Sequence, residues 1–305
     1  MAKQSIWAIA GGKGGVGKSF LSSNLSIDLA QRGNSVVLID ADFGGPNLHT
    51  FMGTASSIIS VSDFIKSDQL RLDDILLPTG IPNLKLASGA QDVIGMANLN
   101  IAQQNKFIKA IKSLGSDYVV IDLGAGTNSY TLDLFLMADT GILVTAPEPT
   151  SVENTYRFVK SSFYRKLKSV VRNPGVKSFL ERITENKDED NPRTPADLVT
   201  DISNINTQAG ETLKYELAKF APKLILNQVR TPTDVRIGFS MTQACKKFFG
   251  VNLGYVGFVE HDNIVIQSIR QRRPVLLNSP DSVASNSISK IGQNIRQNYS
   301  LVNSN

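Results

Sequence analysis

A glycine- and lysine-rich segment near the amino terminus has the clearest chemical character in this sequence. The segment comprises Gly12, Lys13, Gly14, Gly15, Val16, Gly17, Lys18, Ser19 and Phe20. Glycines tolerate positive φ, so the backbone N–H groups of such a loop can turn toward phosphate oxygens. The amino terminus of a following helix adds a dipole that favours the same negative charge. The spacing predicts a phosphate-binding loop in which Lys18 reaches the β- and γ-phosphates and Ser19 ligates Mg²⁺.

Three aspartates follow two further apolar runs. Asp40 and Asp42 come at the end of the run that begins at Ser35, and Asp122 ends the run that begins at Tyr118. The carboxyl ends of parallel strands lie at one edge of a sheet, and such sheets bind ligands at that edge. We therefore expect these carboxylates beside the phosphates, with Asp122 holding Mg²⁺ through water. For Asp40 and Asp42, a turn cap at the strand end is the alternative.

Apolar runs rich in valine and isoleucine alternate with segments of helical period along the whole chain. The predicted strands are Ile6–Ala10, Ser35–Asp40, Leu84–Ala87, Tyr118–Asp122, Gly141–Ala146, Lys223–Asn227 and Gly254–Phe258. Helical patterns include Leu21–Leu29, Ile101–Ile111, Val235–Phe249 and Val283–Arg296. This alternation predicts an α/β fold: a doubly wound, mostly parallel sheet with helices on both faces, of the P-loop NTPase type.

The alternation of strand and helix patterns is interrupted between about residues 169 and 220, where about fifty residues replace a short connection from helix to strand. Turn and helix-start signals recur there, in Asn173-Pro174-Gly175, Lys187–Asp190 and Asn191–Pro195. We predict a helical insertion at the rim of the sheet, within a single domain that spans residues 1–305.

Composition narrows the class of protein. With 41% hydrophobic and 19% charged residues, the chain resembles a soluble globular protein, and no run of about 18 apolar residues is present to span a bilayer. The amino terminus enters an apolar strand directly, which leaves no room for a secretory signal. The one cysteine, Cys245, excludes an internal disulfide and fits a reducing cytoplasm. Cys245 is predicted to be a small core residue, and His49 and His261, which lack metal-ligand spacing, ordinary surface or packing residues.

Lys13 adds a second lysine to the loop. The order Lys-Gly-Gly-x-Gly-Lys-Ser from Lys13 to Ser19 resembles the deviant P-loop ATPases, which include MinD, ParA, the flagellar regulator FlhG, the Mrp-type carriers and the nitrogenase iron protein. In that family the first lysine reaches across a dimer interface to the partner's nucleotide. The resemblance implies a homodimer with ATP in which Lys13 stabilises the transferring phosphoryl group; a solvated lysine is the alternative.

The same resemblance implies roles for other residues and gives ATP and Mg²⁺ as cofactors. Asp42 would orient the attacking water, Asp40 would lie near the Mg²⁺ shell, and Asn47 would belong to the first switch region. Asn227, in the segment Leu224–Val229, would recognise adenine; a helix or turn cap is its alternative role.

Two more segments are similar to family motifs. Tyr118–Gly126 resembles the second switch, but Gly124 stands where relatives commonly have proline, so we expect a more mobile loop. Gly257–Asp262, continuing to Arg270–Val275, resembles the loop that closes over the nucleotide and the helix after it.

Thr145–Tyr156 resembles the Pro-Glu-Pro-Thr segment of MinD and FlhG, whereas the cluster carriers of the family need thiolates that this chain lacks. The resemblance favours a switch that dimerises with ATP and hydrolyses it slowly to regulate spatial positioning through a protein partner, as in flagellar placement or number. The alternative is a DNA-binding partitioning ATPase of the ParA type.

A basic stretch suggests a further contact. Between Arg157 and Arg182 the chain has eight basic residues and one acid, Glu181, and a helix is predicted over Ser151–Val171. Such a helix face could dock on anionic lipid or on DNA phosphates, which would make the protein peripheral at the membrane or the nucleoid. The alternative is that its aromatic residues pack on the sheet while the cations are solvated.

Overall fold

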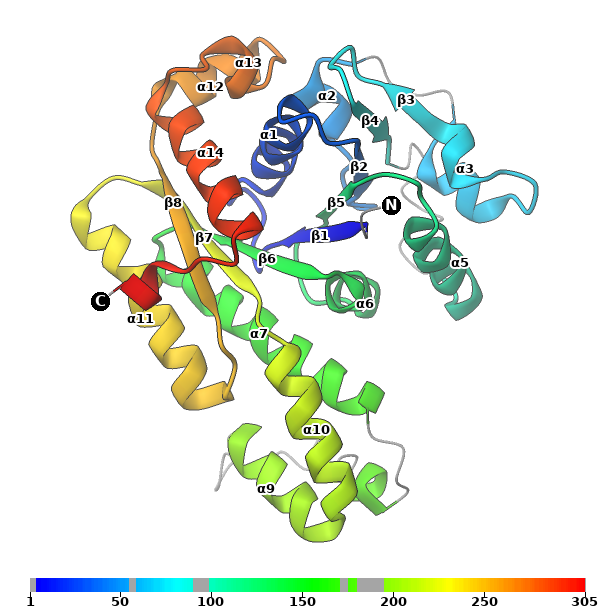
Figure 1. The fold of residues 1–305 in the computed structure, drawn as a ribbon, viewed down its shortest axis with the longest axis vertical. Helices are drawn as coiled ribbons and strands as arrows, with labels where there is room; N and C mark the ends of the chain where they lie inside the picture. The colour runs from blue at the N-terminus through cyan, green and yellow to red at the C-terminus, as the bar shows by residue number, and fades with distance from the viewer. Residues whose placement is uncertain (1–3, 55–58, 90–98, 171–174, 180–194, 305) are drawn as a thin grey trace.

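An eight-stranded sheet forms the centre of the computed structural model, which describes residues 4–54, 59–89, 99–170, 175–179 and 195–304. The strand order is β3-β4-β2-β5-β1-β6-β7-β8, and all neighbours are parallel except β3 and β4 (Figure 1). The strands are β1 (Ser5–Ala10), β2 (Val36–Ala41), β3 (Leu76–Pro78), β4 (Leu84–Ala87), β5 (Tyr118–Leu123), β6 (Thr140–Thr145), β7 (Lys223–Val229) and β8 (Gly254–Glu260). This arrangement confirms the predicted doubly wound α/β class.

The central strands are nearly continuous apolar runs because helices cover them on both faces. All seven predicted strands are present, with ends displaced by no more than a few residues. The additional strand, β3, has three residues, too few for a recognisable period, and ends at Pro78. It pairs antiparallel with β4 at the edge of the sheet, a position at which proline is tolerated.

Helices pack on both faces of the sheet. One face carries α1 (Lys18–Gln31), α2 (Leu48–Met52), α12 (Asn263–Arg270), α13 (Val275–Asn278) and α14 (Val283–Arg296). The other carries α3 (Val61–Lys66), α5 (Ile101–Lys112), α6 (Ser129–Met137), α7 (Pro149–Val170) and α11 (Pro232–Phe249). Short 3₁₀ segments are η1 (Leu72–Ile75) and η2 (Leu301–Ser304). The four predicted helical patterns correspond to α1, α5, α11 and α14.

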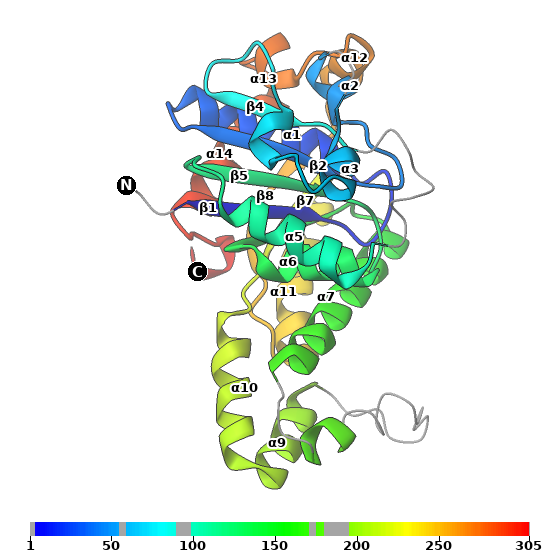
Figure 2. The ribbon, with the colours of Figure 1, turned by 90° about the vertical axis from the view of Figure 1, so that its right-hand side faces the viewer.

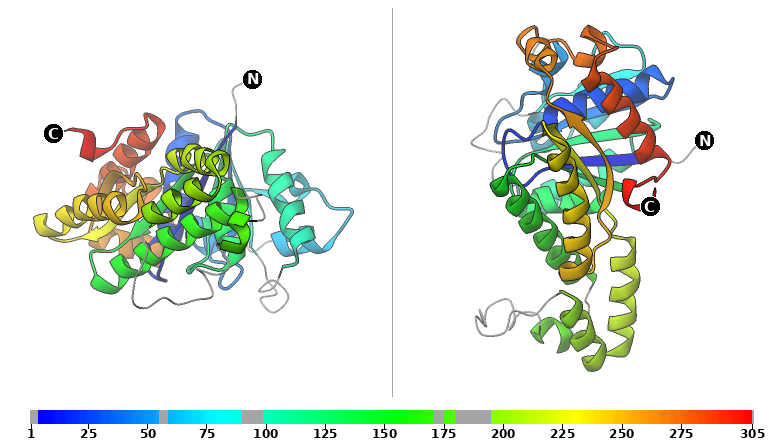
Figure 3. Two further views of the ribbon diagram at one scale, coloured as in Figure 1. Left: turned by 90° about the horizontal axis from the view of Figure 1, so that it is seen from below. Right: turned by 90° about the vertical axis from the view of Figure 1, so that its left-hand side faces the viewer.

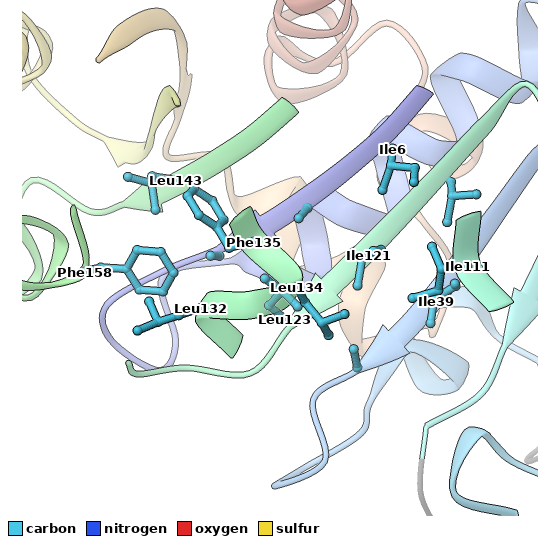
Figure 4. Packing of buried hydrophobic residues seen from close by; sticks show 14 of the residues in the cluster. Ile6, Ile39, Ile111, Ile121, Leu123, Leu132, Leu134, Phe135, Leu143 and Phe158 are labelled. Atoms are coloured by element: carbon cyan, nitrogen blue, oxygen red, sulfur yellow. The ribbon is translucent and has the colours of Figure 1, made fainter. Parts of the chain in front are cut away.

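The core on the α5–α7 face interdigitates side chains from strands and helices (Figure 4). Phe135 of α6 meets Phe158 of α7 edge to face, with ring centroids 5.0 Å apart. Ile121 of β5 and Ile111 of α5 are fully buried farther along the same face of the sheet. This packing fixes the strand ends that carry the candidate site.

On the opposite face, α1 is buried almost all round, between the sheet and α14 (Figure 3). Its serines make this possible because they are small and bond to their own helix. The hydroxyl of Ser23 donates to the carbonyl of Ser19 (2.8 Å) and that of Ser26 to the carbonyl of Ser22 (2.7 Å). The helix that follows the glycine-rich loop is therefore held firmly in the interior.

Two helices, α9 (Pro195–Ile205) and α10 (Thr207–Lys219), project past the sheet near the end of α7 (Figures 1 and 2). They pack closely at Gly210, where a Cβ would lie 2.2 Å from the hydroxyl oxygen of Ser203. Both fall in the stretch predicted as an insertion, and residues 175–179 are also helical. The predicted turns at 173–174 and 187–194 lie outside the described residues, and the single-domain boundary of 1–305 stays a prediction. Within the described ranges, no helix is long and apolar enough to cross a bilayer.

Asp28 connects α1 to α14 from a buried position. Its carboxylate accepts two hydrogen bonds from Arg32, both 3.0 Å, and one of 2.9 Å from Arg296 of α14. Asp28→Ala should lower the free energy of unfolding by roughly 2–4 kcal/mol, because both guanidinium groups lose their acidic partner. Urea denaturation measures this loss. The exposed pair of Arg157 with Glu153 provides the control: Arg157→Ala should change stability by about 0.5 kcal/mol or less. An equal effect of both substitutions would contradict the structural role of Asp28.

Candidate functional site

The glycine-rich loop connects β1 to α1 at the carboxyl edge of the sheet. Gly15 and Gly17 have φ of 79° and 98°, in the left-handed region that glycine tolerates. A Cβ at Gly14 or Gly15 would meet nothing within 4 Å, so this side of the loop is open. At Gly17, by contrast, a Cβ would lie 2.1 Å from the side-chain nitrogen of Asn227. The loop is thus open on the side that would receive phosphates and tightly packed at Gly17.

Strand β7 braces the loop. The side-chain amide of Asn227 donates to the carbonyl of Val16 at 2.8 Å, and that of Gln228 donates to the carbonyl of Gly15 at 3.2 Å. Asn227 is only 5% exposed. The predicted base-recognition residue therefore lies against the loop and holds it in shape, and it also lines the cleft described below.

Two carboxylates lie side by side at the ends of β2 and β5. Asp40 and Asp122 are register partners, and their exposed fractions are 0% and 1%. Burial, together with the negative charge of Asp122, raises the pKa of Asp40 to about 8. Burial also raises the pKa of Asp122, to about 6, although hydrogen bonds from Ser19 and Ser22 oppose the shift. A cation beside the pair would favour the ionised form of both carboxyl groups.

The donors at this edge suit a hard divalent cation. Carboxylate oxygens of Asp40 and Asp122 and the hydroxyl of Ser19 are ligands that Mg²⁺ accepts, directly or through water. Across the part of the chain that is described, no three His, Cys, Asp or Glu side chains form a metal site by themselves. Mg²⁺ commonly takes one or two carboxylates and completes its shell with substrate phosphates and water. The residues present fit that kind of site.

Asp42 lies between the two predicted switch regions. Its carboxylate accepts a hydrogen bond of 3.1 Å from the backbone N–H of Gly44. A Cβ at Gly124 would lie 3.0 Å from the same carboxylate oxygen. Glycine at position 124 thus gives Asp42 the room to lie over the second switch. The mobility predicted for that loop stays a prediction.

A cleft of about 500 Å³ opens above these residues. Of the predicted site residues, it is lined by Gly14, Gly15, Gly17, Lys18, Ser19, Phe20, Asp42 and Asn227, and also by Asn47. Asp40 and Asp122 are buried and do not line it, and Val16 packs into the core. Gly12 lies against α7, where a Cβ would come within 2.2 Å of the carbonyl oxygen of Asn154.

The far wall of the cleft contains residues that had no predicted binding role. They come from α2, from the end of β7, from the end of β8 and the two residues after it, and from α12: Phe51, Gln228, Val259, Glu260, His261, Asp262, Val265, Ile266 and Ile269. Ile266 and Ile269 are more than 40% exposed, which is unusual for large apolar side chains. The similarity of Gly257–Asp262 to a nucleotide-closing loop was the available signal. This wall would suit a planar, weakly polar group.

Lys13 points away from the cleft of its own chain. Its ammonium group lies 3.0 Å from Oε2 of Glu148 and 3.1 Å from the hydroxyl of Thr150, at the start of α7. The side chains of Lys13 and Glu148 are 42% and 57% exposed, so solvent screens the pair and its contribution is about 1 kcal/mol or less. The structure brings the predicted site residues to one edge of the sheet, but within one chain the ammonium group of Lys13 contacts the start of α7 and does not line the cleft.

The basic stretch on α7 is largely paired within the chain. Arg165 makes two hydrogen bonds to Asp133, of 2.8 and 2.6 Å, and Lys166 lies 2.9 Å from Glu216. Arg157 pairs with Glu153, whereas Arg172 and Arg182 fall outside the described residues. The apolar side chains of this helix that pack into the core are Phe158, Phe163 and Leu167. The aromatic residues pack inward, and three of the cations have acidic partners.

Comparisons with known proteins agree with this geometry. The ParA family, described as NUBPL iron-transfer P-loop NTPase, matches residues 2–174. The antiactivator FleN of Pseudomonas aeruginosa is 26% identical over 295 residues, covering 95% of this chain and 85% of FleN. The flagellum site-determining protein YlxH of Helicobacter pylori is 32% identical over 165 residues, 50% of this chain. The chain spans about half the length of YlxH and of the curated MinD proteins that it matches.

Among solved structures, the fold is similar to the septum site-determining protein MinD of Pyrococcus horikoshii, complexed with Mg-ADP. The TM-score is 0.63 with 20% identity, over 96% of each chain. At this identity the likeness concerns the fold.

The brace between β7 and the loop can be tested by stability. Asn227→Ala should lower the free energy of unfolding by about 1–3 kcal/mol in the absence of nucleotide, because the buried carbonyl of Val16 loses its donor. Gln228→Ala, which removes a longer and exposed hydrogen bond, should cost less. Chemical denaturation of the two variants measures the difference. If Asn227→Ala were as stable as the parent, its bond to the loop would not support the structure.

Proposed function

Because the chain belongs to the ParA/MinD family of P-loop NTPases, we propose that it is an ATP-dependent switch. It binds ATP with Mg²⁺, dimerises, hydrolyses the nucleotide slowly and thereby regulates the position of a cellular structure. The observation that carries this proposal is the meeting of the Lys18 loop with Asp40, Asp42 and Asp122 at one edge of the sheet. The fold positions these residues, and their side chains would bind and hydrolyse the nucleotide.

ATP fits the cleft in one orientation. The phosphates would lie on the open side of the loop, where the N–H groups and the amino terminus of α1 attract negative charge. Lys18, in the first turn of α1, would contact the β- and γ-phosphates. The adenine would then reach the apolar wall of α12, beside Asn227. A flat purine matches the exposed Ile266 and Ile269 better than a phosphate would.

Hydrolysis asks mainly for alignment and charge neutralisation. Asp42, on the cleft wall, orients a water molecule toward the γ-phosphorus. The water oxygen bonds to this phosphorus while the bond from phosphorus to the bridging oxygen breaks and ADP leaves. Lys18 neutralises the charge that grows on the phosphate oxygens. Ser19, Asp40 and Asp122 would hold Mg²⁺, which would supply further charge neutralisation to the phosphates.

Dimerisation would bring Lys13 into the reaction. Within one chain it is bound by Glu148 and Thr150, and this exposed contact costs about 1 kcal/mol or less to break. Release at a dimer interface would let Lys13 reach the partner's nucleotide. A charge supplied in trans would make hydrolysis depend on assembly, which is the property of a switch.

The names of two relatives support spatial positioning as the cellular role. FleN is an antiactivator and YlxH a flagellum site-determining protein. We therefore propose flagellar placement or number as the process, with a protein partner. Iron transfer, named in the family description, finds no support here because Cys245 is the one cysteine and is buried on α11.

Asp42→Ala should retain ATP binding and lose turnover by roughly 100-fold or more, because water is no longer oriented. Phosphate release and equilibrium binding of a fluorescent ATP analogue measure the two quantities. Asp281→Ala, an exposed aspartate outside the cleft, should match the parent in both. Normal turnover in Asp42→Ala would remove the residue from the mechanism.

Lys13→Ala should remain monomeric with ATP and hydrolyse it roughly 10³-fold more slowly, as when a trans-acting cation is removed. Light scattering after size-exclusion chromatography reports the mass in ATP and in ADP. Lys109→Ala, at the exposed end of α5, serves as the control. A Lys13→Ala protein that dimerises and turns over like the parent would show that the lysine acts only within its own chain.

Sedimentation separates this function from DNA partitioning. With ATP, Asp42→Ala should not pellet with DNA, because much of the charge on α7 is already paired. Lys160 and Lys168 are exposed on that helix, and their reversal to glutamate tests any residual binding. DNA pelleting that needs ATP and is abolished by these reversals would favour partitioning. Parallel sedimentation with anionic vesicles tests for a membrane contact.

A further inference from the structure

A second cleft, of about 670 Å³, lies at the opposite end of β7 and β8 from the nucleotide site. Its walls are the first residues of these two strands, the last turns of α11 and the segment that follows α14. Figure 1 shows that segment beside α11, at the C-terminal end of the ribbon. The strands thus separate this cleft from the phosphate-binding loop by their full length.

The charged side chains that line this cleft are all positive. Lys223, Lys246 and Lys247 line it, and no carboxylate does. In the described part of the chain, none of these lysines lies within ion-pair distance of an acid. The other polar residues include Gln243 and Asn252, whose exposed amide groups can donate hydrogen bonds. Three lysines and no carboxylate in the lining favour an anionic ligand.

Lys223 lies deepest of the three lysines. It is partly buried at the start of β7, and its ammonium group donates to Oδ1 of Asn298, in the segment after α14. Gly254, its register partner on β8, leaves it room, since a Cβ there would lie 3.2 Å from Cδ of Lys223. Burial lowers the pKa of Lys223, as expected for an ammonium group partly removed from water.

We propose that this cleft is a binding site for a small phosphate-bearing anion, separate from the nucleotide site. Lys223 binds the deeper phosphate, while Lys246 and Lys247 contact the outer part of the ligand. The volume admits a ligand larger than one phosphate group. A free metabolite suits the recessed Lys223 better than the phosphates of a lipid surface, because a planar membrane would reach mainly the two exposed lysines.

Isothermal titration with pyrophosphate tests the site. Since pyrophosphate also suits the glycine-rich loop, every protein in the comparison carries Lys18→Ala, which removes the lysine of that loop. To this background, one variant adds Lys223→Met, Lys246→Gln and Lys247→Gln, and a second adds only the two exposed substitutions. The matched control adds Lys109→Gln and Lys112→Gln, two lysines in the last turn of α5.

The background protein and the control should bind one equivalent of pyrophosphate equally well. The triple substitution should weaken binding by at least tenfold, and the double substitution should weaken it less. Circular dichroism melting checks the fold, and the double variant keeps the test valid if Lys223→Met destabilises β7. Absence of binding by the background protein, or equal binding by the triple variant, would overturn the proposal. The proposal would also be overturned if the three lysines were needed for flotation with phosphatidylglycerol vesicles but not for binding pyrophosphate.

Discussion

The site is organised around two aspartates that face each other across neighbouring strands. The register of β2 and β5 sets Asp40 opposite Asp122, and helices on both faces keep water away from the pair. Two neighbouring buried carboxyl groups are costly to ionise, and the chain offsets part of this cost with two backbone N–H groups from the segment after β2 and with serine hydroxyls from α1. Loop, helix and switch segment are thereby held by the same two carboxylates. An incoming cation and nucleotide would act on all three at once.

The polar residues that could be predicted from sequence share one property: they follow directly on a recognisable strand. A parallel sheet brings strand ends to one edge, so Asp42 and Asn227 meet the glycine-rich loop once the strands are known. Strand β3 was not predictable because three residues show no period. The apolar wall of α12 was missed because exposed isoleucines on a helix look like core positions in a sequence.

Ion pairs between residues far apart in the sequence were the other feature that could not be predicted. Lys13 was expected to reach the nucleotide of a partner chain, and no sequence pattern indicated that within its own chain it contacts Glu148, 135 residues away. The cations of α7 suggested an open basic face, whereas Arg165 meets Asp133 of a neighbouring helix. Such contacts depend on which helices lie side by side, and no local pattern encodes that. Charge counted along a sequence therefore overestimates the charge that a surface presents.

The interior position of α1 constrains how this molecule can respond to a ligand. A helix enclosed by the sheet and α14, and tied to α14 through Asp28 and Arg296, cannot rotate or slide without breaking the core. In the proposed function, the residues of its first turn that would contact the nucleotide are thus held in a fixed position. A response to the nucleotide would then fall to the short segments after β2 and β5, Asp42–Asn47 and 124–128. The protein would report its nucleotide through the shape of those two segments, while the frame beneath them stays constant.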